Sequence, residues 1–299
     1  MLENDVIEII KRNKKLLIKK RILIPFSKDE LHEQHNFVNY LYSNNIKVAK
    51  IIGSYSYRGN LYEYQEYIES EETTMNINDM VIAVSLFHEC SKKSGININK
   101  KSTYDMDFEC NNHKLSKIII GYDDKYSKYP LDNYNKLKDK MGFSCNKKYN
   151  EIMDYYQYCF NYIKTKYKEP DCIIHNDISR NNILCHGKSL YLIDFDLCIK
   201  SYEIVDVTDI VLSNYYGLDN IINNYDEIRK VIKDSVETYN KYNNIGIQDN
   251  DILFQLFLKI VSYNCYVILN KNNKEEFENN FSKVHKILKL IREEWNASI

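Results

Sequence analysis

Two short motifs, separated by one predicted hairpin, constrain the fold of this chain more than any other feature. The first motif, His175 to Asn182, has the form H-x-D-x-x-x-x-N, and the second is Ile193-Asp194-Phe195-Asp196. Asp194 lies seventeen positions after Asp177 (194 minus 177). Apolar segments flank a polar turn at residues 186–189, between the motifs, and this pattern predicts a small β-hairpin.

The order and spacing of these polar residues indicate phosphoryl transfer from ATP. This reaction leaves little covalent work for the protein. It needs a carboxylate that orients and deprotonates the acceptor hydroxyl, and oxygen ligands that hold Mg²⁺ on the phosphates. We therefore predict Asp177 as the catalytic base, with Asn182 and Asp194 as metal ligands. Either motif alone is common by chance, whereas the pair in this order around a hairpin is specific.

Composition favours a soluble cytoplasmic protein and excludes several other classes. The 299 residues carry a formal net charge of -1, so we expect neither nucleic acid nor membrane as a partner. Gln255, Lys259 and Asn264 interrupt the longest apolar stretch, which predicts a buried helix instead of a membrane span. No secretory signal precedes the first predicted strand. The 8 cysteines lack a C-x-x-C pair, which favours reduced thiols.

The order of predicted elements indicates an α+β, two-lobed fold of the protein-kinase type, with a shortened N-terminal sheet lobe. Residues 6–10 and 16–22 form a predicted hairpin, although the first segment also fits a helical face. Ser27-Lys28-Asp29-Glu30 has the form of a capping box and begins a helix that runs to about Ser43. Strands are predicted over residues 48–56 and 61–68. We expect residues 1–70 to form the small lobe, ending in the interlobe hinge.

Residues 71–299 should form a mainly helical lobe that carries the catalytic loop and the metal site. One helix begins near Asn78 and ends before Gly95, and Glu169-Pro170 ends another just before the catalytic loop. Residues 97–147 are polar and hard to place. The predicted helices cover residues 78–94, 114–121, 132–141, 149–167, 207–215, 225–242, 252–269 and 274–297.

A kinase small lobe also needs a strand lysine for the α and β phosphates, held by a helix glutamate. Lys19 occupies the position of that lysine, and strand alternation would point Lys20 to the opposite face. Glu33 is the predicted partner, because it lies one helical turn before Phe37 on the inward side. Glu30 is the alternative.

The adenine ring is expected to contact the hinge. Backbone groups near Glu66 and Ile68 would meet its polar edge, with Ile51 and Ile193 packed against its faces.

Taken together, these residues resemble the aminoglycoside phosphotransferase and choline kinase superfamily. The resemblance rests on Lys19, Glu33, residues 65–68 and the segments HNDISRNNIL and LIDFDLC. Within that superfamily the chain is most similar to the bacterial spore-coat-associated kinase branch. The resemblance implies ATP with Mg²⁺, a small-molecule hydroxyl acceptor and an association with the spore coat. It also implies that His175 braces the catalytic loop and that Asp206 accepts hydrogen bonds from the loop backbone.

Several positions depart from protein kinases. Asn176 replaces the arginine that precedes the catalytic Asp, Ser179 replaces a lysine, and Asp194 to Asp206 leaves no room for a long activation segment. The first glycine is Gly53, so no Gly-rich phosphate loop precedes Lys19. Kinases of this superfamily often lack glycine in that loop, so ATP binding is still expected, with weak clamping of the γ-phosphate as one hypothesis. A start codon upstream of Met1 is another.

Three hypotheses therefore stand. The first, which we favour, is a kinase of a small hydroxylated molecule whose identity the sequence does not give. The second is a choline or ethanolamine kinase, because the loop has the His-Asn-Asp form found in those kinases and because tyrosines are able to cage a cationic amine. The third is a catalytically weak or inactive kinase-like protein of the spore coat, or a scaffold.

Overall fold

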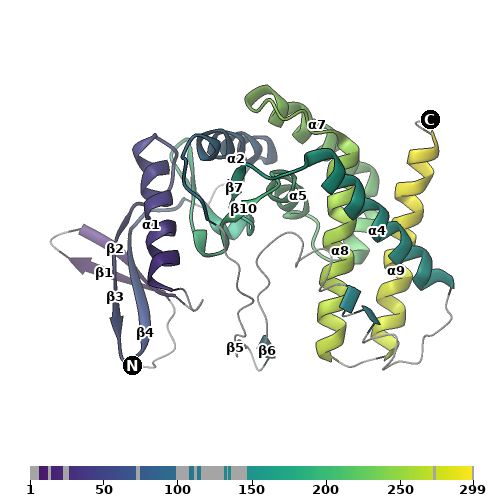
Figure 1. The fold of residues 1–299 in the computed structure, drawn as a ribbon, viewed down its shortest axis with the longest axis horizontal. Coiled ribbons are helices and arrows are strands. Elements are labelled where there is room, and N and C mark those ends of the chain that lie inside the picture. The colour runs from purple at the N-terminus through teal and green to yellow at the C-terminus, as the bar shows by residue number, and fades with distance from the viewer. Residues whose placement is uncertain are drawn as a thin grey trace. The chain divides into compact units, whose positions relative to one another are not determined.

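The structure is a computed structural model of the chain (Figure 1). Its contacts divide the chain into two compact units, Met1–Ile120 with Cys172–Lys200, and Gly121–Asp171 with Ser201–Ile299. The lobe boundary expected near residue 70 stays a prediction. The structure describes residues 7–12, 15–22, 27–71, 75–98, 108–110, 113–115, 131–132, 134–135, 147–271 and 274–297.

The first unit contains a four-stranded antiparallel sheet with the strand order β1-β2-β4-β3. This sheet confirms the predicted small lobe of strands, and the helical alternative for residues 7–10 is wrong. Val48 lies outside β3 and forms an isolated bridge to Leu192. The strands are β1 (Ile7–Arg12), β2 (Lys15–Ile22), β3 (Ile51–Tyr57) and β4 (Asn60–Glu66).

Helix α1 (Lys28–Ser43) begins at the predicted capping box. The backbone N–H of Glu30 donates to the Ser27 hydroxyl at 3.2 Å, and the Ser27 N–H donates to the Glu30 carboxylate at 2.8 Å. These two bonds satisfy backbone donors that the first helical turn leaves unpaired. One face of the helix is buried, and its residues recur at helical spacing: Leu31, Gln34, Phe37, Val38 and Leu41.

The segment that carries both motifs follows β7 (Cys172–Ile174), which contacts α2 (Ile77–Lys92). Ser91 of α2 binds this strand twice, since its hydroxyl donates to the Ile173 carbonyl at 2.9 Å and accepts from the Ile173 N–H at 2.8 Å. The predicted hairpin is confirmed, with Gly187 at φ 60° in its turn. The remaining elements of the segment are η2 (Arg180–Asn182), β8 (Ile183–His186), β9 (Ser189–Leu192), η3 (Phe195–Leu197) and β10 (Ile199–Ser201).

Three buried phenylalanines join α1, α2 and η3. Phe37 lies 6.1 Å from Phe87 and 6.4 Å from Phe195 between ring centroids, and Phe87 lies 5.8 Å from Phe195. All three pairs have the edge-on geometry that aromatic rings favour. This cluster fixes the second motif, through Phe195, against two helices of the same unit.

The second unit is mainly helical. Helix α8 contacts α4, α5, α7 and α9, and two buried carboxylates are paired with lysines inside the unit. Lys166 lies 2.7 Å from Asp251, and Lys259 contacts Asp209. The helices are α4 (Lys147–Tyr167), α5 (Ile204–Leu212), α6 (Leu218–Asn223), α7 (Tyr225–Tyr242), α8 (Asp249–Lys271) and α9 (Lys274–Ala297).

The helix predicted from Lys114 is wrong where the structure describes it. There, β5 (Phe108–Cys110) pairs with β6 (His113–Leu115), and residues 116–121 lie outside the described chain. Residues 131–132 and 134–135 are helical, as expected for that segment, whereas α6 was not predicted. Over the residues that the structure describes, no helix has the length and hydropathy needed to span a membrane.

Candidate active site

The two sequence motifs lie side by side because His175 connects them. Its Nε2 donates to the Ile193 carbonyl at 2.7 Å, and its ring lies 4.7 Å from the Phe195 ring between centroids. The neighbouring Asn176 has φ 67°, the left-handed conformation that an asparagine tolerates, and its Nδ2 donates to the Leu197 carbonyl at 3.2 Å. His175 is fully buried, so its contacts are those of a structural residue within the loop.

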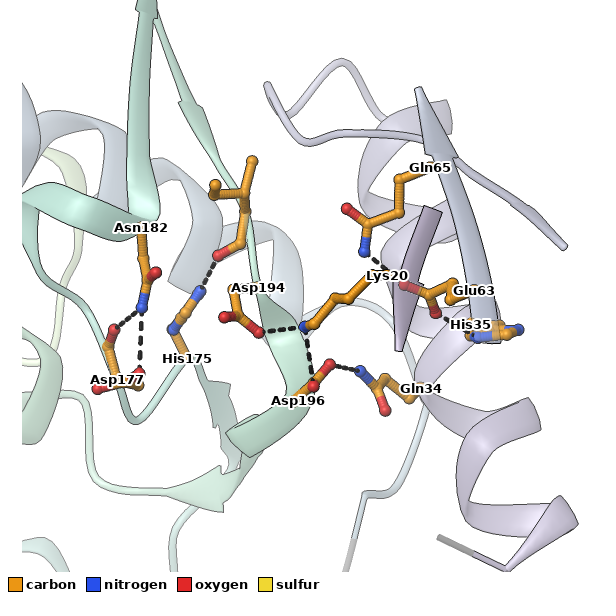
Figure 2. A network of polar contacts seen from close by, with 11 residues as sticks. Lys20, Gln34, His35, Glu63, Gln65, His175, Asp177, Asn182, Asp194 and Asp196 are labelled. Atoms are coloured by element: carbon orange, nitrogen blue, oxygen red, sulfur yellow. Dashed lines mark hydrogen bonds and ion pairs between the residues drawn. The ribbon is translucent and has the colours of Figure 1, made fainter. Parts of the chain in front are cut away.

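The catalytic loop brings Asp177 and Asn182 together. Asn182 Nδ2 donates to the Asp177 backbone carbonyl at 2.7 Å and to its Oδ2 at 3.1 Å (Figure 2). Asp177 is exposed, so its carboxylate is accessible to a ligand. The predicted base and one predicted metal ligand are therefore neighbours, at the end of η2.

Lys20 of β2 joins the second motif to the sheet. Its Nζ lies 2.5 Å from Asp194 Oδ1 and 2.8 Å from Asp196 Oδ2 (Figure 2). The lysine side chain is only 9% exposed. Burial favours a lower Lys20 pKa, but the two carboxylates outweigh it, and the net effect raises that pKa. Lys20 is therefore charged at neutral pH.

The two carboxylates that bind Lys20 differ in their accessibility. The Asp194 side chain is 39% exposed and the Asp196 side chain 13%. Burial favours a higher Asp194 pKa, but the Lys20 charge lowers that pKa below its usual value. For Asp196, burial prevails and the pKa is raised. Asp194 also has φ 65°, the left-handed conformation that aspartate, like asparagine, tolerates.

The structure places Lys20, and not Lys19, beside the second motif. Strand register explains the difference, because Lys20 lies opposite Glu63 whereas Lys19 lies opposite Glu8 on the other face. Lys19 Nζ is 2.9 Å from Glu8 Oε2. Lys19, the predicted lysine for the α and β phosphates, therefore lies on the face away from the second motif, and Lys20 is the lysine of β2 that contacts it. The sequence held a signal for Lys20, since it shares its alternation with the apolar residues Leu16, Ile18 and Ile22.

Helix α1 does not bring Glu33 into the site. Glu33 is exposed, whereas Gln34 lies on the buried face and its Nε2 donates to Asp196 Oδ1 at 3.3 Å. The alternative, Glu30, is part of the capping box. A search for a helix carboxylate missed Gln34 because its side chain is neutral. The regular spacing of Gln34 with Leu31 and Phe37 was the available signal.

Glu63 was also missed. It is fully buried on β4, directly opposite Lys20, and its Oε2 lies 2.5 Å from His35 Nε2. Gln65 donates to its other carboxylate oxygen (Figure 2). The sequence signal was the alternation of Glu63 with Leu61, which places both side chains on one side of the strand. A carboxylate on a buried side needs a partner, so Glu63 was a candidate for an ion pair.

The predicted hinge residues follow the end of β4. The Glu66 N–H donates to the Lys50 carbonyl at 2.9 Å, and Ile68 lies two residues beyond the strand. Ile193 is half-buried, with its N–H donating to the Asn182 carbonyl at 3.0 Å, whereas Ile51 is buried. Their contacts with adenine stay predictions.

Asp206 belongs to α5 of the second unit and is fully buried. Its expected hydrogen bonds with the catalytic loop stay a prediction.

The carboxylate and amide oxygens fit a magnesium ion that arrives with a nucleotide. Among the described residues, no group of three His, Cys, Asp or Glu side chains could hold a metal ion. Mg²⁺ in kinases needs no such group, because it usually takes one or two carboxylates together with substrate phosphates and water. The accessible Asp194 carboxylate and the Asn182 amide meet that requirement.

No family model matches the sequence, and no curated protein matches it. Solved structures do match, at low identity. An aminoglycoside phosphotransferase from Alicyclobacillus acidocaldarius has a TM-score of 0.59 and 11% identity, over 98% of this chain and 91% of that one. An amicoumacin kinase, hAmiN, in complex with AMP-PNP, Ca²⁺ and Ami, has a TM-score of 0.55 and 12% identity, over 95% and 89%.

A choline kinase from Streptococcus pneumoniae gives a TM-score of 0.51 and 12% identity, over 97% of this chain and 91% of that one. These matches show which fold the chain has. The chain has the kinase-like fold found in aminoglycoside phosphotransferases and choline kinases, with a small antiparallel sheet and a helical part.

Proposed function

We propose that the chain is an ATP-dependent phosphotransferase that transfers the γ-phosphoryl group to a hydroxyl of a small molecule. One observation carries the proposal: the Lys20 ammonium bound to Asp194, in the same compact unit as the Asp177–Asn182 pair. The kinase-like fold supports it. Phosphoryl transfer depends mainly on positioning and charge stabilisation, and these residues supply both.

Each polar residue has a role in this proposal. Lys20, in place of Lys19, binds the α and β phosphates, and Asn182 and Asp194 hold Mg²⁺. The bound magnesium nucleotide supplies the phosphoryl group and part of the charge neutralisation. Asp177 orients the acceptor hydroxyl and takes its proton. Its exposure on the loop leaves room for an alcohol to approach.

Adenine binding is proposed on the Lys20 face of the sheet. Ile9 and Leu16 share that face with Lys20 by strand register, and they are 59% and 48% exposed. Covering such apolar surface is favourable, at about 25 cal/mol per Å². Backbone groups of Glu66 and Ile68 would meet the polar edge of the ring, with Ile193 on its other face.

The test is ADP release by the purified full-length chain with Mg·ATP and a panel of aminoglycosides, amino alcohols and sugars. We expect turnover with at least one acceptor. Asp177→Asn should lower kcat by about 10²- to 10⁴-fold, because it removes the proton acceptor. The nucleotide Kd should stay within about threefold of wild type, since Asp177 binds the acceptor and not the nucleotide.

Asp171→Asn is the matched control, an exposed carboxylate just before β7, and it should keep wild-type kcat. If Asp177→Asn kept wild-type turnover, the assignment of the base would be overturned.

A catalytically weak kinase-like protein is the second candidate function. In this candidate the ion pair between Lys20 and Asp194 persists when a nucleotide binds, so that Asp194 does not reach the metal. This candidate predicts nucleotide binding without ADP release for every acceptor tested. The spore-coat association rests on the sequence resemblance alone, and choline or ethanolamine turnover is one outcome of the panel.

A further inference from the structure

The phosphate-binding lysine of a kinase must be held in place by a carboxylate, and α1 does not supply one. Its three acidic residues are Asp29, Glu30 and Glu33. Asp29 and Glu33 are exposed, and Glu30 belongs to the capping box. Gln34 is the α1 residue with a hydrogen bond to the second motif, and its side chain is neutral. The anchor of Lys20 must therefore come from another element.

Asp196 has the geometry of that anchor. Its Oδ2 lies 2.8 Å from Lys20 Nζ, and its Oδ1 accepts from Gln34 Nε2 at 3.3 Å. One carboxylate thus links the β2 lysine to α1 (Figure 2). The edge-on packing of Phe195 against Phe37 holds the same turn on the same helix. Asp196 is therefore fixed both by its hydrogen bonds and by its neighbour in sequence.

Asp194 is less suited to this task. Its side chain is 39% exposed, three times the 13% of Asp196, and it is the carboxylate assigned to Mg²⁺ under the proposed function. While a magnesium nucleotide is bound, Asp196 is the carboxylate left to orient Lys20. Buried charge-assisted hydrogen bonds are about twice as strong as neutral ones, which suits a fixed anchor.

We propose that Asp196 is a positioning residue that orients Lys20 toward the nucleotide phosphates, and that Gln34 couples this anchor to α1. The Asp196–Gln34 pair takes the place of the helix carboxylate expected at Glu33. The inference rests on the proposed function. It assigns a role to the second carboxylate of the Ile193-Asp194-Phe195-Asp196 motif, while Asp177, Asn182 and Asp194 keep their roles.

The pair can be tested by exchanging its chemistry. Asp196→Asn keeps the shape but removes the charge beside Lys20, and Gln34→Glu returns one carboxylate from the helix side. In the double variant the amide at position 196 is able to donate to the carboxylate at position 34, so the hydrogen bond is kept with its direction reversed. The readout is the Kd of Mg·AMP-PNP, measured by calorimetry on the full chain, together with Tm, because Asp194 is assigned to the metal in this complex and Asp196 is then the carboxylate left beside Lys20. Asp29→Asn, an exposed carboxylate on the same helix, is the matched control.

We expect Asp196→Asn to weaken Mg·AMP-PNP binding about tenfold, the effect of losing the one charge-assisted contact that orients Lys20 while Asp194 is engaged by the metal. The double variant should return to within about threefold of wild type, and Asp29→Asn should bind as wild type. Rescue is the decisive result, because a carboxylate needed only for stability would not be replaced from another element.

Three results would overturn the inference. The first is unchanged binding in Asp196→Asn, and the second is a double variant that binds no better than the single one. Both leave the proposed function standing, because wild type still binds. The third is a wild-type chain that binds no nucleotide with or without Mg²⁺, which would overturn the inference and the proposed function together. If Asp196→Asn alone fails to fold, the double variant is compared with wild type directly. A Kd within about threefold of wild type then supports the inference, and a weaker Kd overturns it.

Discussion

The two faces of strand β2 carry neighbouring lysines in opposite settings. Lys20 is 9% exposed, contacts two carboxylates of a distant segment and shares its face with the buried Glu63. Lys19 is 24% exposed, and its partner Glu8, from the adjacent strand, is 42% exposed. Its Nζ lies 4.9 Å from the Tyr62 ring centroid. The Lys20 face, called the inner face below, thus joins the sheet to the second motif, whereas the Lys19 face, the outer face, carries a more exposed ion pair.

This difference shows that strand register and burial, and not the presence of a lysine, decide which residue of β2 belongs to the candidate active site. Both lysines have a carboxylate within 3 Å, so an ion pair alone does not distinguish them. An exposed pair is worth about 0.2 to 1 kcal/mol, because water screens it and the side chains lose freedom. On the inner face, Lys20 contacts two carboxylates, both from the second motif, and its side chain is only 9% exposed to water. Substitutions on the two faces should therefore have very different effects.

The largest expected effect is the loss of Lys20. Lys20→Met should lower kcat/KM for ATP by about 10²-fold or more, because it removes a fixed positive charge that stabilises the transferring phosphoryl group. Lys19→Met, one residue away on the outer face, should change kcat/KM by about twofold or less. Steady-state ADP release measures both values, with circular dichroism to verify that each variant is folded. Equal effects of the two substitutions would break the comparison.

The second effect is on stability and concerns Glu63. Glu63→Gln should lower the free energy of unfolding by about 1 to 3 kcal/mol, because the buried contact with His35 loses its charge. Glu8→Gln, its counterpart on the outer face, should cost about 0.5 kcal/mol or less. Urea denaturation monitored by tryptophan fluorescence or circular dichroism gives both values. A larger loss for Glu8→Gln would show that the burial contrast between the faces has been misjudged.

The smallest effect belongs to the tyrosine column of the outer face. Tyr55 stacks on Tyr62 and Tyr64, with ring centroids 5.2 and 5.4 Å apart. Tyr55→Leu should destabilise the chain by about 0.5 to 1.5 kcal/mol, the usual value of an aromatic pair beyond its buried area. The Kd for Mg·AMP-PNP should stay unchanged, as measured by calorimetry beside the urea curve. A weakened Kd would place the nucleotide on the outer face.

The sequence predicted the elements of the fold well where the apolar pattern and local signals agreed. The capping box at Ser27, the hairpin after Asn182 and the bounds of α7 and α9 are confirmed. These features depend on neighbouring residues only. Helix α6, with six residues, was too short to produce a periodic pattern. The strand at Lys114 lies in a polar segment without such a pattern either.

The side-chain assignments of the small sheet could not be obtained in the same way. Choosing between Lys19 and Lys20 requires the register with β1 and β4, which involves residues far apart in sequence. Glu33 was expected on the inward side because it lies one helical turn before Phe37. The buried face of α1 is centred instead on Gln34, about 100° away around the helix axis, and Glu33 is exposed. The spacing of the two motifs predicted its part of the site better than these single-residue choices did, because both motifs lie in one continuous segment of the chain.

Binding of Mg·AMP-PNP to the full chain tests the central claim most directly, in wild type and in Asp194→Ala. The account predicts one site in wild type and a Kd at least about tenfold weaker in the variant, because Asp194 is the carboxylate assigned to the metal. Lys19→Met should bind as wild type in the same titration. Absence of binding in wild type, or equal affinity in Asp194→Ala, would contradict the account.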